Sequence, residues 1–61
     1  MTYEIAIRAE HVQQAFSGVK NFDNNAAAVA WCKDFANDWW PHAEYLIFCR
    51  DTQAIFQGAA N

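Results

Sequence analysis

Residues that break regular structure are scarce in this sequence, which has only two glycines and one proline among 61 residues. Disordered segments are usually richer in such residues and poorer in apolar ones. Here 54% of the residues are hydrophobic and 16% are aromatic, which favours a globular fold. A chain this short buries only about 60% of its unfolded surface. We therefore expect one small domain, residues 1–61, of modest stability.

Positive charge is the second scarcity. Four Lys and Arg residues stand against seven Asp and Glu, for a net charge of −3. The cations are spread along the chain, at Arg8, Lys20, Lys33 and Arg50. Proteins that bind phosphate backbones usually carry a basic patch, so nucleic acid is not the expected partner. The acids form no run either, and we keep a nucleic-acid-associated or DNA-mimicking regulator only as the alternative function.

Long apolar runs are missing as well. The N-terminal segment has no basic stretch followed by a long apolar core, so we expect neither a signal peptide nor a membrane-spanning segment. Cys32 and Cys49 are the two cysteines. A chain without a secretory signal usually keeps its cysteines as buried thiols, and we expect this here, in a cytoplasmic protein. A disulfide is the alternative, because a predicted helix and a predicted strand could bring the two together.

Motifs of metal centres and active sites do not occur. Zinc sites usually take two ligands from one tight turn, and the sequence has no CxxC or HxxxH pair. A catalytic Cys–His pair would need a cleft and an oxyanion donor, for which the chain has no glycine-rich loop. We therefore expect no metal, no cofactor and no enzymatic activity. Convergence of Cys32, Cys49, His11 and His42 would instead favour a small enzyme or metal protein.

Residues 2–9 alternate between the two faces of a predicted strand. Tyr3, Ile5 and Ile7 fall on the more apolar face, which predicts a strand with one face buried. After a turn near residues 10–11, residues 13–21 are interpreted as a second strand with a bulge at residues 17–18. The competing interpretation is a short helical turn at residues 12–16, which would leave the sheet with three strands.

Residues 23–41 contain the strongest helical pattern. Asp23 is the expected N-cap, with Asn24 or Asn25 as alternatives, and Pro41 predicts that the helix ends near Trp39. At 100° per residue the predicted core stripe consists of Ala28, Cys32, Phe35 and Trp39, with Trp31 and Ala36 beside it.

Residues 44–50 are apolar on both faces, which predicts a strand in the centre of the sheet. A turn at residues 51–53 leads to a short strand at residues 54–57, and residues 58–61 are expected to fray. The predicted fold is a two-layer α+β domain, with one amphipathic helix on a three- or four-stranded, mostly antiparallel sheet. Its order is ββαββ, or βαββ if the second strand fails.

A single helix covers only one face of such a sheet, so large apolar groups should remain on the other. The predicted interface consists of Trp40, Tyr45, Ile47, Ile55 and Phe56. Trp40 lies off the core stripe and is either an interface residue or a structural cap at the helix end. For the sheet, the alternative is that twist and long side chains cover the apolar groups.

These features predict a small, non-enzymatic, cytoplasmic protein that binds another protein. It would modulate, inhibit or adapt a larger partner, as small proteins of phages and mobile elements do. A homodimer through the uncovered sheet face is one form that this binding could take.

Overall fold

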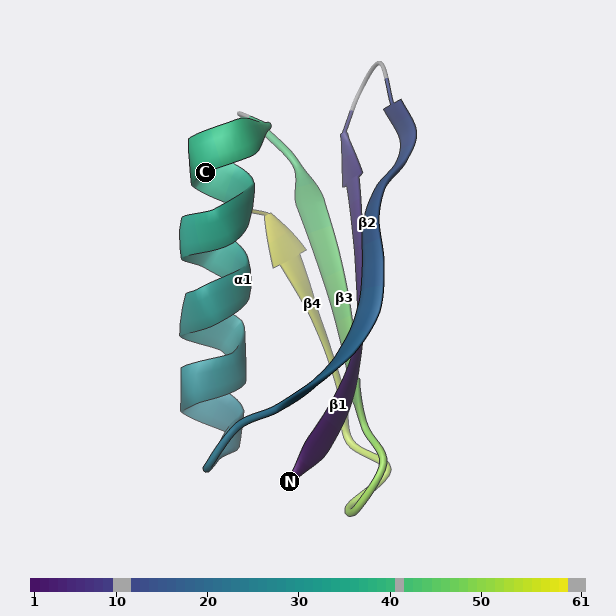
Figure 1. Ribbon diagram of the computed structural model, residues 1–61, viewed down its shortest axis with the longest axis vertical. Coiled ribbons are helices and arrows are strands. Elements are labelled where there is room, and N and C mark those ends of the chain that lie inside the picture. Colours follow the sequence, from purple (N-terminus) through teal and green to yellow (C-terminus); the bar gives the residue numbers. More distant parts are fainter. Residues whose placement is uncertain (10–11, 41, 60–61) are drawn as a thin grey trace.

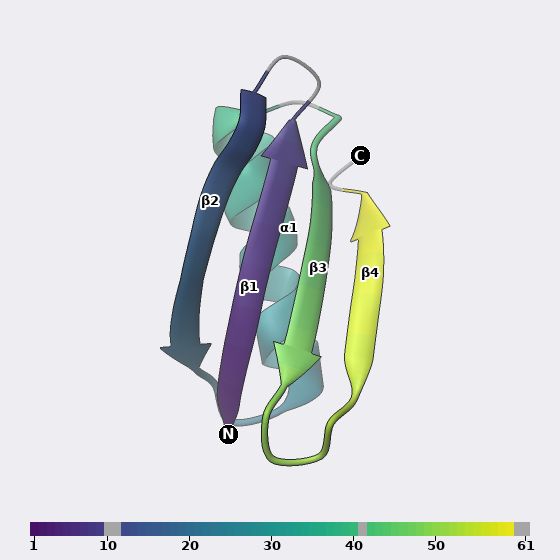
Figure 2. The same ribbon diagram turned by 90° about the vertical axis from the view of Figure 1, so that its right-hand side faces the viewer.

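The computed structural model describes residues 1–9, 12–40 and 42–59, with only the backbone for residues 12–14. Its elements are β1 (Thr2–Ala9), β2 (Val12–Asn21), α1 (Asn25–Trp39), β3 (Glu44–Cys49) and β4 (Ile55–Ala59). The strands form one antiparallel sheet in the order β2-β1-β3-β4, and α1 lies against one face of it (Figures 1 and 2). The predicted α+β fold is thus confirmed in its ββαββ form.

β3 is a central strand, as its two apolar faces predicted, and it lies between β1 and β4. β4 is longer than expected, because Gly58 pairs with Tyr45 and Ala59 pairs with Glu44. The expectation that the chain frays from Gly58 is therefore wrong for residues 58 and 59.

The irregularity in the first hairpin is displaced from its predicted position. Ser17 and Gly18 pair regularly with Ala6 and Ile5, so no bulge lies there. The register instead shifts between Ile7 and Ala9, close to the predicted turn at residues 10–11, which lies outside the described residues. The Ser-Gly pair therefore did not mark the position of the bulge. Both residues fit into a regular antiparallel ladder.

The core lies between α1 and the sheet. Alternate residues of β1 and β3 enter it, and the helix contributes small side chains that let its axis approach the strands closely. The buried hydrophobic residues are Tyr3, Ile5, Ile7, Ala28, Cys32, Ala36, Ala43, Tyr45, Ile47 and Cys49.

The N-terminus of α1 is capped by Asn24. Its backbone is extended, and its side-chain oxygen accepts a hydrogen bond from the Ala27 N–H at 2.8 Å. The N-cap is therefore one residue later than Asp23, at an alternative that the sequence had offered. The C-terminal prediction is confirmed, because α1 ends at Trp39 and the Trp40 N–H donates to the Ala36 carbonyl at 2.7 Å.

The buried line on α1 runs through Ala28, Cys32 and Ala36. A turn takes 3.6 residues, so positions spaced by four drift around the helix, and this line crosses the sheet at an angle. Trp40, which continues the spacing, packs against the core, whereas Trp39 is 67% exposed. The predicted core position of Trp39 is therefore wrong.

A chain of aromatic contacts runs from β2 across to α1 and ends at the exposed Trp39. It consists of Phe16, Phe22, Trp31, Phe35, Trp39 and Trp40. Trp31 and Phe35 stack with ring centroids 4.9 Å apart, and Phe16 meets the edge of Phe35 at 5.3 Å. The Lys20 ammonium lies 4.9 Å from the centroid of a Trp31 ring, within range of a cation–π interaction. These contacts hold the helix to the β2 side of the sheet.

Candidate functional site

The sheet face opposite α1 is the candidate site, and we call it the open face; Figure 2 views it directly. Strand alternation sends every second side chain to this face, and the pairing arranges these side chains in rows. One row contains Val19, Glu4, Phe48 and Ile55, and the next contains Ser17, Ala6, Leu46 and Gln57. A third row places Arg8 beside Glu44 and Ala59.

The open face carries accessible apolar side chains on the central strand β3 and on both border strands. Val19 is 53% exposed, Leu46 is 45% exposed and Ile55 is 65% exposed. Phe48 and Ala6 lie between them and are half-buried. These residues come from all four strands, so the regular register of the sheet, rather than a loop, sets their spacing.

Two ion pairs lie among these apolar side chains, and Glu4, in one of the pairs, stands between Val19 and Phe48 in its row. The Arg50 Nε donates to a Glu4 carboxylate oxygen at 3.0 Å, and an Arg8 guanidinium nitrogen lies 3.7 Å from a Glu44 oxygen. All four side chains are about half exposed or more, so the pairs contribute little to stability. The open face therefore combines exposed apolar groups with charged groups that are already paired.

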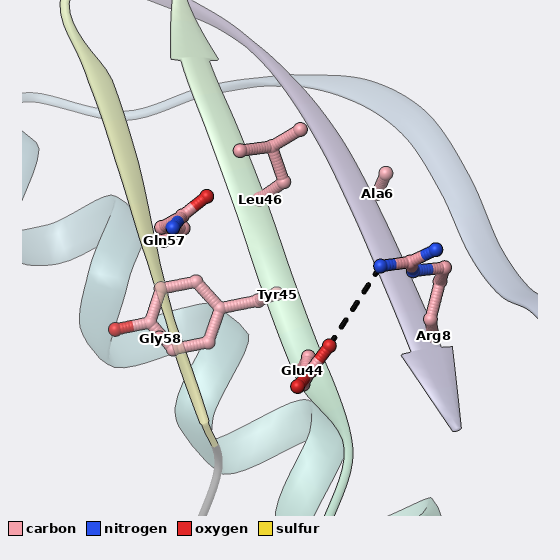
Figure 3. Close-up of a pocket in the computed structure, with 7 residues that line it drawn as sticks. All are labelled: Ala6, Arg8, Glu44, Tyr45, Leu46, Gln57 and Gly58. Carbon is pink, nitrogen blue, oxygen red and sulfur yellow. Dashed lines mark ion pairs between the residues drawn. The ribbon is translucent and has the colours of Figure 1, made fainter. Parts of the chain in front are cut away.

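Two shallow depressions lie on the open face. The larger, about 650 Å³, is lined by Ala6, Arg8, Glu44, Tyr45, Leu46, Gln57 and Gly58 (Figure 3). The smaller, about 280 Å³, lies between β2 and β3 and includes Val19 and Phe48. Both are open to solvent, unlike the enclosed pockets that bury most of a small ligand.

The predicted interface residues separate into three groups. Ile55 is exposed on the open face, as expected. Tyr45 and Ile47 are 7% and 0% exposed beneath α1, so their expected place on an accessible surface is wrong. Phe56 and Trp40 are half-buried against the core on the helix side.

Val19, Leu46 and Phe48 are the open-face residues that were missed. Both faces of β3 are apolar, and Tyr45 and Ile47 look no more buried in the sequence than Leu46 and Phe48. The sequence did contain one indication of the exposed face. Glu44 and Arg50 alternate in step with Leu46 and Phe48, so these charged residues lie on the same face and mark it as the solvent face.

Within the described residues, His42 and the two cysteines do not form a common site. Cys32 and Cys49 are both buried free thiols. His42 is exposed and precedes β3, whereas Cys49 ends it, so the length of the strand, roughly 20 Å at 3.3 Å per residue, separates them. His11 lies outside the described residues. Among those that are described, no group of His, Cys, Asp and Glu could hold a metal ion.

Burial and local contacts shift the pKa values of three buried groups, Tyr3, Cys32 and Cys49. Burial raises the pKa of the Cys32 thiol to about 11. A hydrogen bond with the Thr52 side chain lowers the pKa of Cys49. Burial, and then the neighbouring Cys49, raise the pKa of Tyr3, whose hydroxyl donates to the Asn25 side-chain oxygen at 2.6 Å. Each of these groups lies on the helix side, away from the open face.

The cations do not converge. Arg8 and Arg50 pair with carboxylates on the open face, Lys20 lies over Trp31, and Lys33 is exposed on the helix.

No helix within the described part of the chain is long and apolar enough to cross a membrane. Comparisons with protein-family models, curated proteins and solved structures find no match to this chain.

Proposed function

We propose that this chain is a small protein-binding module whose open face docks on a larger protein. The observation that carries the proposal is the set of large apolar side chains exposed on the open face, Val19, Leu46 and Ile55. Contiguous apolar surface on a soluble domain is characteristic of interaction sites. Burial of these side chains by a partner would add the apolar area that a 61-residue core cannot hide by itself.

Charge supports a protein partner over a nucleic acid. Arg8 and Arg50 are the open-face cations, and each already faces a carboxylate, at 3.7 Å and 3.0 Å. A phosphate backbone would have to displace Glu44 and Glu4 from them. A protein surface with an apolar patch and its own polar border requires no such exchange.

The proposed mode of action is binding without catalysis. Shallow depressions and a regular strand surface suit a flat contact that blocks or adapts a larger protein. We place this activity in the cytoplasm, where Cys32 and Cys49 would remain free thiols. Small regulators carried by phages and mobile elements act in this manner.

A pair of lysine substitutions tests the proposal. Leu46→Lys places a charge at the centre of the open face, between Glu44 and Phe48, where the nearby carboxylate tolerates it. Ala30→Lys makes the same charge change on the exposed side of α1. Tagged wild-type and variant proteins would be used for affinity capture with quantitative mass spectrometry, followed by direct titration of the captured protein.

We expect Leu46→Lys to weaken binding of the captured protein at least tenfold, because a buried charge costs well over 1 kcal/mol at an apolar contact. Ala30→Lys should bind like the wild type. Equal binding by all three proteins would refute the proposal. If the wild type and both variants bind DNA in a salt-dependent manner, the nucleic-acid alternative would be favoured.

A further inference from the structure

The outer edge of β4 is a second surface with its own chemistry. β4 pairs with β3 on one side and forms one border of the sheet (Figure 2). An edge strand presents unpaired backbone N–H and C=O groups, which can template pairing with another strand. Natural proteins usually protect such edges with charged residues, proline or bulges.

β4 has none of these protections. Its sequence, IFQGA, contains no charged residue and no proline, and its pairing with β3 is regular throughout. β2, at the other border, contains Lys20, and its pairing with β1 shifts register near Ala9. β4 is therefore the less protected of the two edges.

The hydrogen-bonding direction of each β4 residue follows from the ladder. The Cys49 N–H donates to the Ala54 carbonyl at 2.9 Å, so Ala54 points its backbone groups toward β3. Antiparallel strands alternate this direction at every residue. Phe56 and Gly58 therefore also point inward, and Ile55, Gln57 and Ala59 point their N–H and C=O groups outward.

The side chains of β4 are complementary to those of a second, antiparallel β4. With a two-fold axis at Gln57, each Gln57 faces its own copy, and Ile55 faces Ala59 of the second copy. On the helix side, Phe56 faces Gly58 of the second copy, which the Tyr45 ring of that copy already covers. On the open face a large residue thus opposes a small one, and this register uses the outward-pointing residues as hydrogen-bonded pairs.

We propose that β4 pairs with β4 of a second copy of this chain, centred on Gln57, so that two four-stranded sheets join into one. The open faces then lie on the same side of the joined sheet. Ile55, the most exposed of the large open-face residues, gains a neighbour across the new pair. The dimer leaves Val19 and Leu46 accessible, so it is compatible with docking on a larger protein.

The size of this contact predicts a reversible dimer. A standard interface takes roughly 800 Å² from each partner, which would be about a fifth of the 4107 Å² surface of this chain. One five-residue strand provides less than that. We therefore expect monomer and dimer to exchange with concentration rather than a permanent dimer.

Gln57→Pro is the decisive variant. Proline at this position lacks the outward-pointing N–H, and its ring blocks the approach of another strand. The hydrogen bonds between β4 and β3 remain, and proline is tolerated in edge strands. Gln57→Ala keeps the N–H and is the matched control. Sedimentation velocity from low micromolar to millimolar concentration should show dimer formation by the wild type and Gln57→Ala, and a monomer at every concentration for Gln57→Pro, with unchanged circular dichroism.

A cysteine at the proposed axis tests the register independently. Opposed residues of a hydrogen-bonded pair have Cα atoms about 5.5 Å apart, within disulfide range. Gln57→Cys should therefore give a covalent dimer under mild oxidation, whereas Ser17→Cys, exposed on β2, should not.

Three results would overturn the proposal. The first is a wild type that stays monomeric at all concentrations. The second is a Gln57→Pro variant that dimerises like the wild type. The third is equal cross-linking of the two cysteine variants. In the second case, loss of the dimer in Leu46→Lys would assign self-association to the open face instead.

Discussion

Gly58 shows how one missing side chain shapes this fold. The Tyr45 ring lies across β4 at this residue (Figure 3), and a Cβ at Gly58 would come within 2.7 Å of the Tyr45 hydroxyl oxygen and 2.9 Å of its Cζ. Gly18 is less constrained, because its Cβ would approach the Phe16 ring at 3.1 Å. The glycine in β4 therefore lets Tyr45 fill the core, at some cost to strand propensity.

We predict that Gly58→Ala lowers the free energy of unfolding by about 1–3 kcal/mol, the usual cost of overpacking a core. Gly18→Ala should cost less, because the end of the Phe16 ring can shift. Urea denaturation followed by tryptophan fluorescence would measure both. A smaller loss for Gly58→Ala than for Gly18→Ala would contradict this account, and Tyr45→Phe should partly relieve the Gly58→Ala variant.

Cys32 predicts a loss of stability at high pH. Its pKa is about 11 in the folded protein, against an ordinary value of 9.0. Between these values the unfolded chain binds fewer protons than the folded one, so the free energy of unfolding falls as pH rises. The loss due to Cys32 should reach about 1–3 kcal/mol by pH 11.

Comparison with Cys32→Ala isolates this effect. Tyr3 contributes in the same direction and Cys49 in the opposite one, and both remain in the variant. The variant will be less stable at pH 7 because of the cavity it leaves. Its urea midpoint should nevertheless depend less on pH between 9 and 11 than that of the wild type. Parallel curves for the two proteins would show that Cys32 is not the responsible group.

Trp39 and Trp40 show where reasoning from single positions fails. By helical angle, Trp39 belongs to the stripe of Cys32 and Phe35, yet it is 67% exposed. A prediction from helical angle assumes that the helix contacts the sheet along its own axis. The buried residues of α1 instead follow the line through Ala28, Cys32 and Ala36. That crossing direction depends on packing between distant segments, which no local pattern contains.

At the scale of the elements, the start of α1 depends on Asn24. We predict that Asn24→Ala lowers the free energy of unfolding by about 0.5–2 kcal/mol, because the Ala27 N–H loses its side-chain acceptor. Asn24→Asp should keep the cap and gain from the positive end of the helix dipole. Thermal denaturation followed by circular dichroism would compare the variants.

Asp23→Ala is the matched control, because Asp23 is the cap that the sequence alone favoured. It should cost less than Asn24→Ala, since only an interaction with the helix dipole is removed. The reverse order would mean that the helix begins one residue earlier in solution. Both candidates are good capping residues, so the preference of the sequence for Asp23 was weak, and the extended backbone and side-chain hydrogen bond of Asn24 identify it as the cap.

The sequence predicted where the strands lie, but it did not always predict which face of a strand is buried. β1 was predictable in full because its polar and apolar residues alternate, which also identifies its buried face. β3 was predictable as a central strand but not as to which face lies beneath α1, because Leu46 and Phe48 are as apolar as Tyr45 and Ile47. The error for Tyr45 and Ile47 came from this ambiguity.

At the scale of the whole molecule, the fold class followed from local patterns, whereas the strand order and the candidate site did not. The patterns predicted the ββαββ order of the elements, and tertiary packing then placed β1 beside β3. The open face is instead defined by what α1 leaves uncovered. Val19 and Ile55 share this surface only because β2 and β4, at opposite borders of the sheet, both turn these residues away from α1.

The size of the molecule makes self-association visible in its stability. A ligand that binds only the folded state raises the melting temperature with concentration, and a second copy of the chain is such a ligand. For a domain of this size, about 1 kcal/mol shifts the melting temperature by roughly 4–8 °C. We predict that the melting temperature of the wild type and of Gln57→Ala rises by several degrees between low micromolar and millimolar concentration. Gln57→Pro should melt at one temperature throughout. A concentration-independent wild type would show that pairing at β4 does not stabilise the folded chain.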